Sequence, residues 1–91
     1  MTANNDMTGW EGQPDAEVLQ ALAGQDLSAL RELHRRYARL LYAFAQKKRV
    51  PNPDRWVRDA FVRIMRHAGC FARTSLQPRI WVIAMVQDLA V

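Results

Sequence analysis

The sequence predicts an all-α domain, a compact arrangement of four helices. Three observations predict this fold class. Apolar residues recur at steps of three and four along each long segment, which is the period of a helix buried on one face. No segment alternates apolar and polar residues with the period of two that strands show. Between the segments stand Pro, Gly, Asn and Asp, which are typical of helix starts and ends.

The chain is predicted to be one domain, because 91 residues, 49% of them apolar, suffice for one core and not for two. Residues 1–14 are polar and are expected to form a flexible tail, although Trp10 can dock on the body, and residues 15–91 are expected to form the domain. We expect a cytoplasmic protein without a membrane partner. The start of the chain lacks signal-peptide features, Arg interrupts the apolar segments, and the single cysteine fits a reducing compartment.

The first helix is predicted to run from Asp15 to Gly24. Asp15 is expected to cap its N-terminus, and Glu17 lies where the helix dipole favours an acid. Gly24 is typical of a helix end. The apolar stripe of this helix consists of Val18, Leu19 and Leu22.

The second helix has the strongest apolar period in the chain. Asp26 is expected to cap its start. The run of bases over residues 47–49 suits its C-terminal end, where the helix dipole favours cations. The side chains expected to face the core are Leu27, Leu30, Leu33, Tyr37, Leu40, Leu41 and Phe44.

The third helix is predicted to follow the break at residues 50–53. Asn52 can cap it, Pro53 fits the first helical position, and Gly69 is expected to end it. The inward residues are expected to be Val57, Ala60, Phe61, Ile64 and Ala68. The opposite face carries Arg55, Asp59, Arg63 and Arg66.

The fourth helix is predicted to start at Ser75 as its cap, with Pro78 tolerated in the first turn. The residues expected to face inward or half-inward are Ile80, Trp81, Ala84, Met85 and Leu89.

Charge is separated along the chain. The first thirty residues carry five acids and no base, and residues 31–91 carry all 13 Lys and Arg against four acids, so a segment of about −5 precedes one of about +9. A separation of this size is typical of proteins that bind polyanions. An ordinary solvated helix surface rich in Arg is an equally good interpretation of the charge alone.

Catalytic and metal chemistry have little support in the sequence. There is no pair of carboxylates with suitable spacing and no Gly-rich phosphate loop. His67, Cys70 and His34 are the only soft donors, and a structural zinc site needs four ligands. We interpret His67 as solvated and Cys70 as a small buried residue. We therefore expect neither an enzyme nor a cofactor.

The loop at residues 70–75 and the start of the fourth helix collect Arg, short hydroxyls and aromatics. Arg and hydroxyl side chains contact phosphates, and aromatic rings stack on unpaired bases, so this mixture suits a separated DNA strand. Phe71 and Trp81 also fit core positions, and for Trp81 the core is slightly favoured.

The order of three segments resembles region two, the N-terminal conserved domain, of an extracytoplasmic-function sigma factor of the bacterial sigma-70 family. The segments are DAEVLQALAGQDLSALRELHRRYARLLYAFA, NPDRWVRDAFVRIMRHAGCF and SLQPRIWVIAMVQDLAV, and together they span Asp15 to Val91. The resemblance implies a helical sigma region-two-like domain. It implies binding to the clamp helices of the large subunit of core RNA polymerase, and capture of a base from the non-template strand of the promoter's minus-ten element.

The resemblance also implies roles for particular residues. Polymerase binding would fall on Asp54, Arg55, Arg58, Asp59 and Arg63. DNA binding would fall on Arg73, Thr74, Ser75, Arg79, Trp81, Gln87 and Asp88. The family's second DNA-binding domain does not follow in this sequence, which is expected of either a fragment or a stand-alone product.

The sequence departs from the family at contact positions. Arg55 stands where an acid is expected, Arg58 where Gln is expected, and Gln87-Asp88 where Arg-Asn is common. Reversed charge at a contact can cost several kcal/mol, and an added anion weakens attraction to phosphate. A second hypothesis is therefore a degenerate sigma-like module that binds a protein, such as an anti-sigma factor, or oligomerises, without recognising a promoter.

Overall fold

The computed structural model describes residues 9–89, and this part of the chain contains four α-helices and no strand. The helices are α2 (Asp15–Ala23), α3 (Leu27–Lys48), α4 (Pro53–Phe71) and α5 (Pro78–Val86). The predicted all-α, four-helix fold class is therefore confirmed. Residues 1–8 of the expected tail, and residues 90–91, lie outside the described residues.

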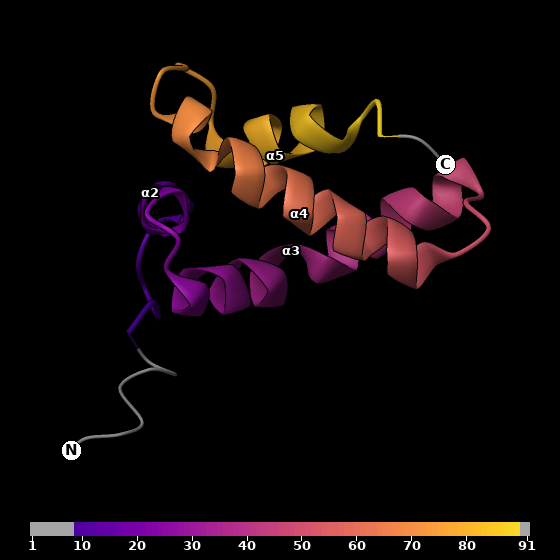
Figure 1. The fold of residues 1–91 in the computed structure, drawn as a ribbon, viewed down its shortest axis with the longest axis horizontal. Coiled ribbons are helices and arrows are strands. Elements are labelled where there is room, and N and C mark those ends of the chain that lie inside the picture. Colours follow the sequence, from indigo (N-terminus) through magenta and orange to yellow (C-terminus); the bar gives the residue numbers. More distant parts are fainter. Residues whose placement is uncertain (1–8, 90–91) are drawn as a thin grey trace.

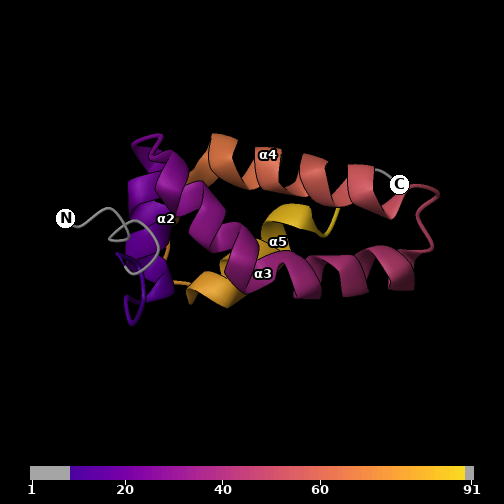
Figure 2. The same cartoon turned by 90° about the horizontal axis from the view of Figure 1, so that it is seen from below.

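The two long helices, α3 and α4, run side by side in opposite directions and are joined by a short connection (Figure 1). The short helix α2 lies across one end of this pair and packs on both members (Figure 2). Helix α5 returns along α4. All four helices therefore share one core, and the α4–α5 loop lies at the same end of the molecule as α2.

The core draws its side chains from every helix. The largest side chains with almost no exposure are Trp81, Leu19, Leu22, Leu33, Leu41, Ile64, Val18, Val82 and Val86. Full burial of one such aliphatic side chain is worth about 1.5–3 kcal/mol. The predicted stripe of α2 and the five predicted inward residues of α4 are all buried, as expected.

Two helix starts are capped as predicted. The Asp26 carboxylate accepts a hydrogen bond from the Ser28 amide at 2.9 Å. The Asn52 side chain accepts one from the Arg55 amide at 3.1 Å, and Pro53 occupies the first turn of α4. These bonds satisfy amide donors that a helix start otherwise leaves without a partner.

Three predicted boundaries were wrong. Asp15 does not cap α2, because its carboxylate is engaged by side chains of α3 and Pro14 stands at the cap position. Helix α4 continues through Gly69 to Phe71, since glycine permits a helix end without requiring one. Helix α5 starts at Pro78 after Gln77 rather than after Ser75, and proline suits a first turn because it has no amide hydrogen to satisfy.

Burial also differs from prediction at a few positions. Leu27 is 70% exposed because it is the first residue of α3. In α5, Ile80 is 51% exposed and Ala84 is exposed, whereas Val82 and Val86 are fully buried. Trp81 is buried and Met85 and Leu89 are half-buried, as predicted, so the buried face of α5 keeps part of the predicted face and is rotated toward Val82 and Val86.

Cys70 is exposed, in contrast to the predicted small buried residue. It lies between Ala68, which is buried, and Phe71, which is half-buried and faces α5. Successive residues of a helix point about 100° apart, so the inward turn of its neighbours leaves Cys70 on the solvent side.

Candidate functional site

The α4–α5 loop, residues 72–77, presents exposed polar side chains at the end of α4. Arg73, Thr74 and Ser75 are exposed in this loop, and Arg79 is exposed in the first turn of α5. The Thr74 hydroxyl donates a hydrogen bond to the Phe71 carbonyl oxygen at 2.9 Å, which closes the end of α4. Four of the predicted DNA-binding residues therefore lie together.

The segment that runs from the second half of α4 to the end of α5 carries Arg and no acid. No Asp or Glu occurs in the sequence between Asp59 and Asp88, whereas four Arg do. Phe71, at the base of the loop, is half-buried. Exposed Arg side chains beside a partly accessible ring form a surface that can attract phosphate and contact an unpaired base.

Trp81 was predicted either to bind DNA or to lie in the core, and the structure places it in the core, 2% exposed. Its ring meets Phe71 edge to face, with centroids 5.7 Å apart and an interplanar angle of 69°. A ring packed in this way presents no free face for a base. Trp81 instead supports Phe71 from behind, which is a positioning role for the loop.

Gln87 and Asp88 do not join the loop residues. They follow α5 at its far end, and the nine residues of α5 extend about 13 Å. There the Asp88 carboxylate accepts a hydrogen bond from Arg63 at 2.9 Å, and the Lys48 ammonium donates to the Gln87 carbonyl oxygen. The predicted DNA-binding residues therefore form two separate groups. Gln87 is bonded to α3 and Asp88 to α4, away from the loop.

The residues predicted to bind polymerase lie on the outer side of α4. Asp54, Arg55, Arg58 and Asp59 are exposed, and 35% of the Arg63 side chain is exposed beside Asp88. The Tyr42 hydroxyl of α3 donates a hydrogen bond to the Asp54 carboxylate, and this contact raises the pKa of Tyr42. Asp54 is therefore tied to α3, and Arg55, Arg58 and Asp59 remain available to a partner.

A surface groove between α3 and α4 was not predicted from the sequence. It has a volume of about 260 Å³ and adjoins a wider hollow of about 700 Å³ toward the C-terminal end of α4. Val62 and Met65 line both hollows. We call the two together the α3–α4 groove; its apolar lining is Leu27, Leu30, Val57, Phe61, Val62 and Met65, with Ala23 at its end.

Two features shape this groove. The His34 ring lies against the Phe61 ring, with centroids 4.8 Å apart, and both rings line the groove. Leu27 is 70% exposed and Val62 is 39% exposed, so apolar surface faces solvent. The sequence held a signal for this groove in two apolar residues. Leu27 stands at the start of α3, and Val62 lies outside the predicted inward set of α4.

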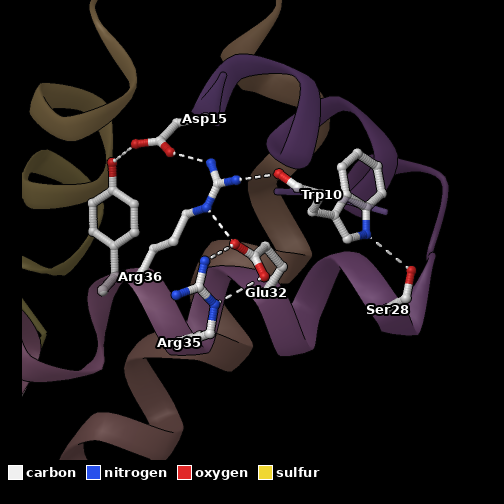
Figure 3. A network of polar contacts seen from close by, with 7 residues as sticks. Trp10, Asp15, Ser28, Glu32, Arg35 and Arg36 are labelled. Carbon is white, nitrogen blue, oxygen red and sulfur yellow. Dashed lines mark hydrogen bonds and ion pairs between the residues drawn. The ribbon is translucent and has the colours of Figure 1, made fainter. Parts of the chain in front are cut away.

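A polar network that the sequence did not reveal joins the start of α3 to α2 and to Trp10 (Figure 3). The Arg36 guanidinium donates to Glu32 at 2.6 Å, to Asp15 at 2.6 Å and to the Trp10 carbonyl oxygen at 2.7 Å. The Tyr37 hydroxyl donates to the second Asp15 oxygen at 2.6 Å. The residues directly before α2 are therefore attached to the folded body.

Trp10 docks on the body, as the sequence allowed. Its indole N–H donates to the Ser28 hydroxyl at 3.1 Å, and its side chain is half-buried (Figure 3).

The network also shifts the pKa of two of its members. Burial and the bond to Asp15 raise the pKa of Tyr37. Hydrogen bonds from Arg35 and then Arg36 lower the pKa of Glu32 against the opposing effect of burial. The network holds the N-terminal segment at the same end of the molecule as the cationic loop.

Within residues 9–89, no three His, Cys, Asp or Glu side chains lie close enough to share a metal ion. In the same part of the chain, every helix is too short or too polar to span a bilayer.

Comparison of the chain with protein-family models, with curated proteins and with solved structures finds no match.

Proposed function

We propose that this chain is a sigma-factor region-two-like domain that acts in transcription initiation without catalysis of its own. In this proposal it binds the clamp helices of core RNA polymerase through α4, and it holds the non-template strand of the promoter's minus-ten element at the α4–α5 loop. The observation that carries the proposal is the pair of exposed Arg side chains, Arg73 and Arg79, in and beside a loop segment that contains no acid.

The proposed mechanism is selection of DNA that is already opening. Arg73 and Arg79 attract the phosphates of one strand, and the hydroxyl of Ser75 contacts the backbone nearby. A base leaves the stack at a cost of a few kcal/mol, and contact with the exposed part of Phe71 offsets that cost. Trp81 keeps the Phe71 ring in place from within the core.

Binding to polymerase would use the exposed side chains of α4. Asp59 retains the acidic character of the family, whereas Arg55 and Arg58 add positive charge. The Arg63–Asp88 ion pair links this helix to the end of α5, so a partner on α4 is coupled to the segment that follows the DNA-binding loop.

The proposal is tested by fluorescence anisotropy with a labelled single-stranded minus-ten oligonucleotide at several salt concentrations. Replacing both Arg73 and Arg79 with Ala should weaken binding and flatten the slope of log affinity against log salt by about 1.4, because each lost phosphate contact contributes about 0.7 for a single strand.

The matched control is Lys47→Ala, which also removes an exposed cation but at the C-terminal end of α3, away from the loop. Its salt slope should equal that of the parent. Binding that is indifferent to sequence and to salt, or a slope changed equally by the control, would count against DNA recognition at the loop.

A second function is favoured by the reversed charges of Arg55 and Arg58, both exposed on α4. In it the domain binds a protein, an anti-sigma factor or another copy of itself, without recognising a promoter. Arg55→Glu with Arg58→Glu separates the two functions. Loss of oligonucleotide binding would assign this face to DNA, and loss of a protein partner with unchanged DNA affinity would assign it to that partner.

A further inference from the structure

We propose that the α3–α4 groove is the docking site for an acidic amphipathic helix of a partner protein. The inference rests on the proposed function only in assigning α4 to a protein partner, and it does not depend on DNA binding at the loop. It adds the shape and the charge of the partner.

The lining of the groove is largely apolar. Val62 and Met65 of α4 line both of its hollows, and Leu27 of α3 extends it toward the end of α2. Leu27 and Val62 are the two exposed large apolar residues of the lining, at 70% and 39%. Apolar side chains placed along a channel between two helices match the groove-binding mode by which proteins accept the apolar face of a third helix.

The α3–α4 groove is long enough to hold a helix. Its lining on α4 runs from Asp54 to Gly69, which corresponds to about 22 Å of helix, or about 15 residues of a docked helix. Gly69 has nothing within 4 Å of where a side chain would begin, so this end of the channel is open. The channel thus accommodates four turns of a partner helix.

The exposed charged side chains along the groove are mainly cationic. Arg58 and Arg66 are exposed, and each lines one of the two hollows. The one carboxylate that lines the groove, that of Asp54, already accepts the Tyr42 hydroxyl. A helix that docks there therefore meets two exposed guanidinium groups, and acidic flanks on that helix complement them.

Other occupants fit less well. The largely apolar lining offers few partners for the hydrogen bonds of a nucleic acid. A second copy could present its own acidic helix, α2, but Asp15 in that helix is held by Arg36 and Tyr37. An acidic helix from another protein meets both the apolar and the charged requirements.

The experiment uses the whole chain and two synthetic helical peptides of about 15 residues. Both carry the same Leu stripe at helical spacing, one flanked by Glu and the other by Lys. We expect the Glu peptide to bind about tenfold more tightly than the Lys peptide, by an amount that shrinks as salt rises. Amide chemical shifts should move at Leu27, Val62 and Met65.

The variant Val62→Glu should abolish binding of the Glu peptide, and the fold should survive because Val62 is already partly exposed. Ile80→Glu is the matched control, since Ile80 is an exposed apolar residue on α5 outside the groove lining, and it should leave peptide binding unchanged. Because Val62→Glu leaves the loop intact, its oligonucleotide affinity should equal that of the parent.

Three results would overturn the inference: neither peptide binds, both bind equally well, or Val62→Glu binds the Glu peptide as the parent does. Sedimentation that shows a dimer abolished by Val62→Glu would also overturn it and assign the groove to a second copy. Failure of DNA binding together with selective binding of the Glu peptide would reject the loop proposal and leave this one standing.

Discussion

At the scale of single residues, Arg36 determines how the N-terminal half of the molecule is joined. Its side chain is 16% exposed and meets two carboxylates and one carbonyl oxygen from three segments of the chain. The planar guanidinium has enough donors to satisfy all three at once, and Lys could not reproduce this geometry. Glu32, 8% exposed, would be a costly acid at this position without its two Arg partners.

The pKa of Glu32 gives a prediction for the pH dependence of stability. It is lowered from its ordinary value of 4.5, chiefly by the hydrogen bond from Arg35. A carboxyl whose pKa is lowered by folding stabilises the protein above its unfolded pKa, and this contribution is lost as pH falls through the folded pKa. Glu32→Gln should therefore lower the free energy of unfolding by roughly 1 kcal/mol at neutral pH.

The measurement is urea unfolding of parent and variant from pH 7 to pH 3. The difference between them should narrow as the pH falls below about 4.5, because the unfolded parent then takes up a proton at Glu32 while the folded parent still holds this carboxylate charged. Glu17→Gln is the control, an exposed acid of α2 without an Arg hydrogen bond among those described here. A gap between parent and Glu32→Gln that stays constant across this range would contradict the assignment.

At the scale of elements, α4 and α5 show what local sequence can predict. The inward face of α4 was predicted correctly because its 19 residues repeat the apolar period several times and its start has a capping residue followed by proline. In α5 the predicted face was correct only in part, because Ile80 and Ala84 are exposed and Val82 and Val86 are buried. Nine residues give little more than two turns, and the predicted cap, Ser75, lies three residues before the first helical residue.

The Asn52 cap gives the prediction at this scale. Asn52→Ala should lower the free energy of unfolding by about 1 kcal/mol, because the Arg55 amide loses its acceptor at the start of α4. Hydrogen exchange at the Arg55 amide should accelerate in the variant. Gln77→Ala is the control, since Gln77 stands at the same position of α5 and makes no capping hydrogen bond. Equal losses in the two variants would mean that the cap itself contributes nothing.

At the scale of the whole molecule, the sequence predicted the number of helices, their order and most of the core. It did not predict the Arg36 network or the α3–α4 groove. Arg36 and Asp15 are far apart in sequence, and their contact depends on where α2 crosses α3. The groove likewise depends on the spacing between α3 and α4. Periodicity identifies which face of a helix is apolar, and it carries no information about which neighbour that face meets.

The shared core predicts that the four helices unfold together. Helix α2 is only nine residues long, and an isolated helix of that length is unstable in water, so it depends on its contacts with α3, α4 and α5. Leu19 of α2 is fully buried. Leu19→Ala should therefore cost about 2–5 kcal/mol of unfolding free energy, a large part of the stability of a small domain.

Hydrogen exchange distinguishes a shared core from a loosely attached helix. In a shared core, Leu19→Ala lowers the protection of buried amides in α4 and α5 by the same free energy as in α2. Leu27→Ala, a truncation of the same kind at an exposed position, should leave protection unchanged. If Leu19→Ala lowered protection in α2 alone, α2 would unfold independently of the other three helices. The loop and the groove would then be held by α3, α4 and α5 without it.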